Sequence, residues 1–552
     1  MTMATRLLSE EVDAKYIRNN PLVEAILQGA KETVAMQRND LEGISDLQDR
    51  YKYGLVCAAV AYLKPPSVLH LLGAINDPRC DELERSNNQE VALIAASITG
   101  DLLRMKDLLD SGTNIDCQDG LFGAPLSMAA FGGHLSAVKL LLDHGADWKC
   151  ENHHGPSPLF YAAIAGHVSV CDQLIGAGSS ANKLLLYAAA AAGQDRVVSL
   201  LMKQGIVDPN DKYRSLLLIA IKRNFPNVVE ELLKHPSVDA EICELDEKKT
   251  ALEIAAELGR DSIVELLLSH PSVDATSGGN GFALSYAAEG GHAGVVRLLL
   301  NVPQVNPNAR PLNGRYPAYG GLTPLTRAAL CGHNDVVRLL ISHKDIDVNL
   351  KTTEAPGWDG WAPLGRAVKY SHSDVVATLL EHPHTQVNIE QTWGQTPLAE
   401  ASQENLPEII ELLLACDCID PNVRDFYGRG PVFYAADYRS YKAMKLLLSH
   451  PGIQAHVPDD DGSETPLMRA AAAGAYLSYT TTTEEAYGNV AQLLLNHREG
   501  EEPTEDHILG ALEVAQDHEV ESIERILQHA LDYGYCSSAA RKPSPAPDEH
   551  QE

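Results

Sequence analysis

The sequence predicts an all-α solenoid of stacked helix–turn–helix units with projecting loops or short β-hairpins. Three observations support this fold class: the chain has 552 residues, a pattern recurs along it about every 33 residues, and each copy holds two short amphipathic segments. A single hydrophobic core stops growing at roughly 250–300 residues, so a chain of this length requires several domains or a repeat array. The fixed period favours the array.

The repeat begins at a leucine-like anchor that recurs twelve times. The anchors are Leu93, Leu126, Leu159, Leu186, Leu217, Leu252, Leu284, Leu325, Leu364, Leu398, Val432 and Leu467. An alanine follows each anchor at the third position, and this small side chain allows two helices to approach closely. The alignment predicts about twelve repeats over residues 88–500.

The first helix of each unit has start and stop signals in the sequence. Thr323, Thr396 and Thr465 each precede a proline, which places an N-capping hydroxyl before a residue whose backbone is already set for a first helical turn. Seven residues after most anchors a glycine provides the left-handed conformation that ends a helix. This turn glycine is missing at Asn224 and Arg439.

The second helix of each unit carries the apolar stripe, as in residues 264–268 and 336–341. It commonly ends in a histidine followed by proline, as at His235 and His270, because proline cannot continue a helix and a histidine suits the negative helix end. A polar loop, which we call a finger, then leads to the next unit.

The two ends of the chain differ from the repeats. Residues 1–87 are expected to form an N-terminal helical cap with a degenerate repeat, and residues 501–535 a C-terminal capping helix pair, because terminal units of a repeat array must close its core. Residues 536–552, which contain three prolines, are expected to be a disordered tail.

The units resemble ankyrin repeats. The resemblance rests on the Gly-x-Thr-Pro-Leu-x-x-Ala-Ala-x-x-Gly-His and Val-Val-x-Leu-Leu-Leu patterns, which are clearest at residues 321–333 and 120–134, and it covers about residues 88–530. It implies a stack of helix pairs that binds other proteins along its fingers and inner helices. The Asp-Val-Asn style of finger is similar to that of long ankyrin-only proteins of filamentous fungi.

Composition excludes several classes of function. The net charge of −31 repels nucleic acid and anionic lipid, and favours partner proteins with a basic face. No apolar run is long enough for a membrane span, and no secretory signal is visible, so we expect an intracellular protein in the cytoplasm or nucleus. Ten cysteines without a disulfide framework suit a reducing compartment.

No motif in the sequence indicates catalysis, a cofactor or a metal. Phosphate-binding glycine loops, zinc-protease helices and nucleophile elbows are absent, and the glycine-rich residues 278–281 follow no predicted strand. Twelve of the 21 histidines recur at the turns and ends of helices. Cys416 and Cys418 form only a weak metal signal, and free thiols are the favoured interpretation. We therefore expect no enzyme activity.

Aromatic residues are scarce, at 6% of the chain, but they gather in four successive fingers. The candidate partner-binding residues are Tyr316, Tyr319, Trp358, Trp361, Trp393, Phe426 and Tyr427. Tryptophan and tyrosine are enriched in binding hot spots, and stacking would place these fingers side by side. The alternative is that these rings pack against their own loops.

The sequence thus predicts a protein-interaction scaffold or adaptor that binds partners through its fingers and concave helix surface. An alternative is a non-catalytic subunit that recruits substrates to an enzyme assembly, for example in protein modification. It would need a docking segment, for which residues 1–85 and the tail are the remaining candidates.

Overall fold

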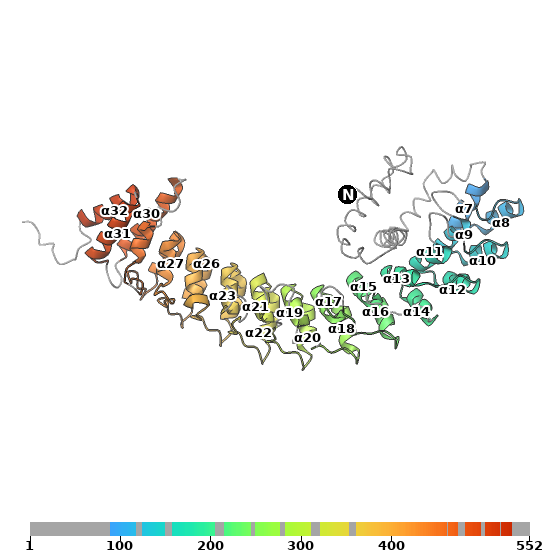
Figure 1. Ribbon diagram of the computed structural model, residues 1–552, viewed down its shortest axis with the longest axis horizontal. Coiled ribbons are helices and arrows are strands. Elements are labelled where there is room, and N and C mark those ends of the chain that lie inside the picture. The colour runs from blue at the N-terminus through green and yellow to red at the C-terminus, as the bar shows by residue number, and fades with distance from the viewer. Residues whose placement is uncertain are drawn as a thin grey trace, which may run out of the picture. The chain divides into compact units, whose positions relative to one another are not determined.

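The computed structural model places helix after helix along the chain (Figure 1). The structure describes residues 89–117, 124–149, 157–204, 215–243, 249–276, 282–310, 321–352, 360–460, 462–472, 481–497, 503–518 and 520–532. The predicted N-terminal cap and the predicted disordered tail lie outside these residues. The chain divides into two compact units: the first runs to Ala255 and includes Ser262–Asp274, and the second holds Ala256–Asp261 and the chain from Ala275 onward.

The first unit consists of helix pairs. Its helices are α7 (Gln89–Thr99), α8 (Leu102–Asp110), α9 (Pro125–Phe131), α10 (Leu135–Asp143), α11 (Pro158–Ala165), α12 (Val168–Gly176), α13 (Lys183–Ala191), α14 (Asp195–Lys203), α15 (Leu216–Arg223) and α16 (Pro226–Leu233). The division between the units falls at α17 (Ala251–Glu257) and α18 (Asp261–Ser269).

The second unit continues the same pattern. Its helices are α19 (Phe282–Glu289), α20 (Ala293–Leu300), α21 (Pro324–Cys331), α22 (Asn334–Ile341), α23 (Pro363–Lys369), α24 (Ser373–Leu380), the 3-10 turn η3 (Thr392–Gly394), α25 (Pro397–Gln403), α26 (Pro407–Leu414), α27 (Pro431–Asp437), α28 (Tyr441–Leu448), α29 (Pro466–Ala472), α30 (Thr481–Asn496), α31 (Glu505–Asp517) and α32 (Glu521–Asp532). The first helices α19, α21 and α23 contact one another in one row, and α20, α22 and α24 form a second row (Figure 1). The all-α repeat fold is therefore confirmed.

The start and stop signals of the first helices act as predicted. At α21 the Thr323 hydroxyl accepts a hydrogen bond from the Thr326 amide at 3.1 Å, Pro324 is the first helical residue, and Gly332 ends the helix with φ +77°. At α17, Thr250 and Glu253 form a reciprocal capping box, with N–H to oxygen distances of 2.9 and 3.2 Å. Local side chains thus set the helix ends.

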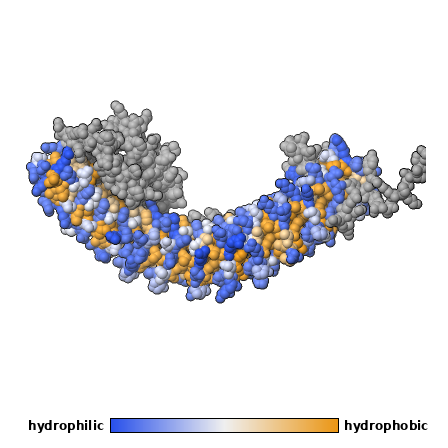
Figure 2. Space-filling view, turned by 180° about the vertical axis from the view of Figure 1, so that it is seen from behind, coloured by the Kyte–Doolittle hydropathy of each residue, from blue (hydrophilic) through white to orange (hydrophobic). Residues whose placement is uncertain are grey.

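The core of each unit consists of the anchor residues, the alanines and the apolar stripe. Leu325, Ala328, Val336, Val337 and Leu340 are all 0% exposed, and the same positions are buried along the chain. Burying one leucine or valine side chain contributes about 1.5–3 kcal/mol. Hydrophilic residues cover much of the outer surface, with hydrophobic residues visible between them (Figure 2). No described helix is both long and apolar enough to cross a membrane.

Histidines join consecutive repeats at the turn between the two helices. Each donates a hydrogen bond from Nε2 to a backbone carbonyl of the preceding repeat. These bonds are His134 to Ile98 (2.9 Å), His167 to Phe131 (2.9 Å), His292 to Glu257 (2.9 Å), His333 to Glu289 (2.8 Å) and His372 to Leu330 (3.0 Å). In the first unit, Gln194 donates to Ile164 at 3.0 Å in the same way.

Each of these imidazoles lies where the side chain of a turn residue in the preceding repeat would be. A Cβ added to Gly291 would lie 2.7 Å from Nδ1 of His333, and one added to Gly332 would lie 2.6 Å from Nδ1 of His372. Glycine is therefore required at these turns for two reasons, since φ is also positive, at +73° and +77°. The pair of glycine and following histidine is a contact between repeats.

Among the described residues, four of these turns carry another residue at positive φ. They are Asn224 (61°), Ser371 (62°), Asn405 (54°) and Arg439 (60°). The sequence pattern singles out only the first and last of them. In the second unit, the repeats after Ser371 and Asn405 have Leu406 and Ser440 in place of the histidine. A turn residue with a side chain is thus found where the next repeat has no imidazole to accommodate.

Ion pairs connect the first helices of the second unit. Arg327 of α21 pairs with Glu289 of α19, and Arg469 of α29 pairs with Asp437 of α27 at 2.7 Å. The Lys369 ammonium lies 2.6 Å from Glu400, a carboxylate that is only 2% exposed. Burial raises the pKa of Glu400, and Lys369 partly offsets this effect. These pairs fix the register of neighbouring helices.

His456, near the C-terminal end of the second unit, is buried and lies close enough to two other histidines to be affected by their charge. His456 is 3% exposed, and burial together with nearby His497 and His507 lowers its pKa to about 4. Within the described residues, the buried Nε2 atoms of His456 and His497 have no hydrogen-bond partner. His456 is therefore packed as a neutral imidazole.

We predict that Gly291→Ala destabilises the second unit more than Gly452→Ala does. Gly452 also has positive φ, +84°, but an added Cβ would meet nothing within 4 Å. Gly452→Ala therefore reports backbone strain alone, which should lower the free energy of unfolding by about 1 kcal/mol. Gly291→Ala must also displace the His333 ring, so its free energy of unfolding should fall by at least about 1 kcal/mol more. Denaturant unfolding measures both. Equal losses would mean that the imidazole contact adds nothing.

We also predict that acid destabilises the C-terminal helices through His456. Because its folded pKa of about 4 lies below its unfolded value of 6.5, its contribution is present above pH 6.5 and is lost as the pH falls toward 4. From pH 7 to pH 5 this one group should account for about 2 kcal/mol. His456→Phe should reduce the pH dependence of unfolding by that amount; an unchanged dependence would contradict the prediction.

Candidate partner-binding surface

The finger tips of the second unit are closed by short backbone hydrogen bonds. In the finger that contains η3, the Gln391 amide donates to the Gln395 carbonyl at 2.8 Å and the Gly394 amide to the Gln391 carbonyl at 3.0 Å. The next finger repeats this geometry: the Asp425 amide donates to the Arg429 carbonyl at 3.0 Å, and the Gly428 amide donates to the Asp425 carbonyl at 3.0 Å. Each tip is therefore a tight turn with glycine at the same place.

Neighbouring tips are also bonded to each other through their backbones. The Phe426 amide donates to the Trp393 carbonyl at 3.0 Å, and the Asp460 amide donates to the Tyr427 carbonyl at 3.2 Å. A Cβ on Gly394 would lie 2.7 Å from the Phe426 ring, so this glycine allows the tips to stack closely. Three consecutive tips thus form one continuous edge.

Three aromatic side chains project from this edge into solvent. Trp393 is 64% exposed, Phe426 68% and Tyr427 52%. We call these three residues the aromatic ridge. Large aromatic side chains are usually buried, so an exposed group of them indicates a contact surface.

The backbone of Trp393 is held in an unfavourable conformation. Its φ is +65°, in the left-handed region that bulky residues rarely adopt. Such a conformation costs on the order of 1–3 kcal/mol. Since the ring is mostly exposed, its own packing offsets little of this cost. The conformation instead directs a tryptophan outward at the tip.

Asp425 organises the tip that bears Tyr427. Its carboxylate is 6% exposed and accepts hydrogen bonds from the Tyr427 amide (2.9 Å), the Arg429 amide (2.8 Å) and the Tyr434 hydroxyl (2.6 Å). Burial, together with the hydrogen bond to Asp425, raises the pKa of Tyr434. The Arg429 guanidinium lies 5.2 Å from the centre of the Tyr427 ring. The hydrogen bonds to Asp425 therefore fix the backbone of the turn that carries Tyr427.

The other predicted site residues lie elsewhere or outside the described residues. Trp361 is only 8% exposed, and the Arg366 guanidinium lies 4.7 Å from its ring centre. Its amide donates to the Thr352 hydroxyl at 3.2 Å. Trp361 thus packs at the base of its own finger. Tyr316, Tyr319 and Trp358 are outside the residues that the structure describes.

An asparagine ladder, which the sequence analysis does not identify, joins the bases of the fingers. The side chain of each asparagine accepts from one backbone amide of the next finger and donates to one of its carbonyls. The contacts are Asn308 with Asp347 and Asp345 (2.8 and 2.6 Å), Asn349 with Gln386 and His384 (2.9 and 2.7 Å), Asn388 with Asp420 and Cys418 (3.0 and 2.8 Å), and Asn422 with Gln454 and Gly452 (2.8 and 2.9 Å). The recurrence of asparagine two residues after Asp347, Gln386 and Asp420 is the sequence signal for it.

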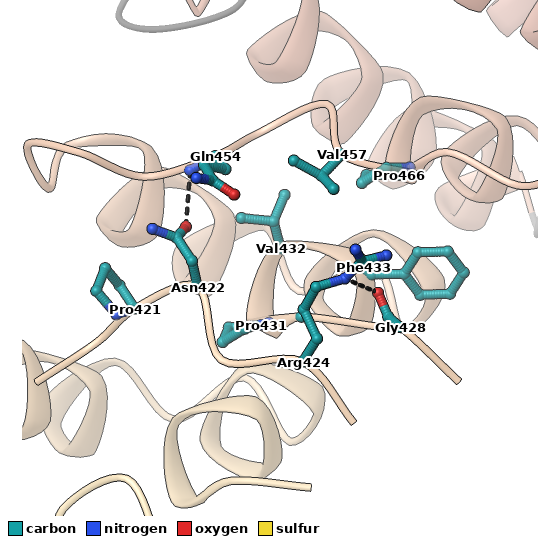
Figure 3. A pocket seen from close by; sticks show the side chains of 11 residues that line it. Pro421, Asn422, Arg424, Gly428, Pro431, Val432, Phe433, Gln454, Val457 and Pro466 are labelled. Carbon is teal, nitrogen blue, oxygen red and sulfur yellow. Dashed lines mark hydrogen bonds between the residues drawn. The ribbon is translucent and has the colours of Figure 1, made fainter. Parts of the chain in front are cut away.

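A small cavity lies between two finger bases (Figure 3). Asn422, Val432, Gln454 and Val457 line it, and its volume is about 20 Å³. That volume holds about one water molecule, far below the roughly 300–1,000 Å³ of a small-molecule site. The Arg424 guanidinium at its edge donates to the Gly428 and Pro458 carbonyls. The cavity is a gap between fingers.

The described residues offer little for metal or nucleophile chemistry. Among them, no group of three or more histidine, cysteine or acidic side chains could hold a metal ion. Burial raises the pKa of the Cys416 thiol, which favours the less reactive thiol form over the thiolate. The exposed aromatic ridge is thus the candidate site that the geometry supports.

Four consecutive segments of the chain match the family model described as ankyrin repeats, at residues 92–184, 185–278, 275–352 and 349–425. Together these segments cover more than half of the chain. The chain belongs to the ankyrin repeat family. Ankyrin repeats are generally protein–protein interaction modules and are typically non-catalytic. No curated protein matches the chain.

We predict that two tryptophan substitutions in this ankyrin array differ strongly in their effect on stability. Trp361→Ala removes a buried ring and should cost about 3 kcal/mol of unfolding free energy. Trp393→Ala removes an exposed ring and should change that free energy by less than about 0.5 kcal/mol. Chemical denaturation followed by circular dichroism compares them. A large loss for Trp393→Ala would mean that its ring supports the fold.

Proposed function

We propose that the protein is an interaction scaffold or adaptor, and that the aromatic ridge of Trp393, Phe426 and Tyr427 binds partner proteins. The observation that carries this proposal is the exposed Trp393 side chain on a backbone at φ +65°. A strained, outward-facing aromatic residue suits a hot spot, because rings of this type lose little conformational entropy on binding.

The surroundings of the ridge favour a partner with a basic face. Glu390, three residues before Trp393, is exposed, and the partly exposed carboxylates of Asp460 and Glu464 are paired with Arg424 (3.6 Å) and Arg469 (3.5 Å). Carboxylates beside exposed rings attract lysine and arginine side chains through charge and through cation–π contact. The net charge of −31 adds long-range attraction of the same sign.

We further propose an intracellular location. The six described cysteines are free thiols: Cys117, Cys171, Cys243, Cys331, Cys416 and Cys418. Free thiols of this number suit a reducing compartment.

Affinity capture from cell extract, compared between the native chain and Trp393→Ala/Phe426→Ala, tests the proposal. The variant should lose a specific partner, and the purified partner should bind it at least about 30-fold more weakly, a loss of about 2 kcal/mol. Leu103→Ala is the matched control, because Leu103 is an 80% exposed apolar side chain far from the ridge in sequence.

The readout must separate binding from folding. Circular dichroism should show the same helix content and the same unfolding midpoint for both proteins. If the ridge variant keeps every partner with unchanged affinity, the ridge is not the binding surface. If it loses partners only together with stability, the rings are structural.

A further inference from the structure

The turn between α27 and α28 lies at the opposite end of these helices from the ridge. α27 leads from the finger at Gly430 to the turn at Tyr438, and α28 returns from Ser440 toward the next finger. The surface at this turn is therefore distinct from the aromatic ridge. We call it the turn-edge surface. It is formed by Tyr438, Arg439, Tyr441 and Lys442 at the turn, together with Lys445 in the last turn of α28.

This surface is positively charged within a strongly acidic protein. No aspartate or glutamate occurs between Asp437 and Asp459, a stretch that contains Arg439, Lys442 and Lys445. Asp437 itself is paired with Arg469 at 2.7 Å. Lys442 and Lys445 are exposed, and no ion pair engages them among the described residues. The whole chain has 75 acidic and 44 basic side chains, so a stretch with basic residues and no acidic ones departs from its overall composition.

Lys442 occupies a helix position where the neighbouring repeats have acids. The first turns of α22, α24 and α26 carry Asp335, Asp374 and Glu408, whereas that of α28 carries none. An acid at a helix N-terminus is stabilising and a cation there is unfavourable, by about 0.3–1 kcal/mol. Helix stability therefore does not explain a lysine in place of an acid at this position. The lysine strengthens the positive potential at this turn.

Two exposed tyrosines lie on either side of Arg439 in this turn. Tyr438 is 51% exposed and Tyr441 is 42% exposed. Between them, Arg439 adopts φ +60°. The buried Ser440 donates to the Gln403 carbonyl at 3.2 Å and thereby ties the turn to the preceding repeat. The surface is thus preorganised, and it presents hydroxyl and cationic donors together.

We propose that the turn-edge surface binds an acidic peptide segment of a partner protein. Lysine and arginine supply charge-assisted hydrogen bonds to carboxylate or phosphate groups, and tyrosine supplies contact area and a hydroxyl donor. A short segment fits better than a long polyanion. A long polyanion would also extend over the preceding repeat, where the exposed Glu404 and Glu408 would repel it, whereas a short peptide need only contact the lysines of α28.

Fluorescence anisotropy of a labelled glutamate-rich peptide, titrated with the full chain, tests this proposal. A peptide with glutamine in place of glutamate should bind at least about tenfold more weakly. Added salt should lower the affinity of the glutamate-rich peptide. A phosphoserine version distinguishes phosphate from carboxylate recognition. Lys442→Glu/Lys445→Glu should reduce affinity for the acidic peptides at least about tenfold. Tyr441→Ala should reduce it without changing net charge.

The matched control is Lys106→Glu/Lys139→Glu, which changes the net charge equally at two exposed lysines of the first unit. It should retain binding, as should Trp393→Ala/Phe426→Ala, which makes this proposal separable from the ridge. The proposal would be overturned if both double variants lost the same affinity for the acidic peptides, or if Lys442→Glu/Lys445→Glu lost none. A single-stranded oligonucleotide of matched charge that binds more tightly than the peptides would also overturn it.

Discussion

The contact between a turn glycine and the histidine of the next repeat underlies the regularity of this array. The imidazole occupies the volume that a Cβ on Gly291 or Gly332 would need, and it donates to a carbonyl at the end of the preceding first helix. A repeat cannot bury its apolar stripe alone, so interfaces between neighbours determine stability. This contact fixes both the distance and the register at one edge of each interface.

Neighbouring fingers are joined by asparagine side chains at their bases and by backbone hydrogen bonds at their tips. The aromatic side chains at the tips are not part of these bonds. The asparagine ladder satisfies backbone groups at the finger bases with side chains of one residue type. Backbone bonds from Phe426 to Trp393 and from Asp460 to Tyr427 then join the tips, and Gly394 and Gly428 leave room for this close approach. Because these bonds do not use the side chains of Trp393, Phe426 and Tyr427, a ridge of exposed aromatic residues is compatible with an intact stack.

Sequence periodicity predicts the helices, their ends and the core correctly, because anchors such as Leu325 and caps such as Thr323 act through local geometry. It does not distinguish Trp361 from Trp393. Both are tryptophans next to a glycine in a finger, yet one is 8% exposed against Arg366 and the other 64% exposed on a left-handed backbone. That difference depends on contacts between residues of different segments, which spacing alone does not encode. The left-handed turns at Ser371 and Asn405 escape prediction for a similar reason, since their tolerance depends on the next repeat.

The histidine contacts between repeats all have the same direction. In each one, the later repeat donates to a backbone carbonyl of the earlier repeat: His333 donates to Glu289, and His372 donates to Leu330. A ribosome delivers the chain in the same order, from the N-terminus onward. For this contact, the acceptor carbonyl is therefore synthesised before the histidine that donates to it.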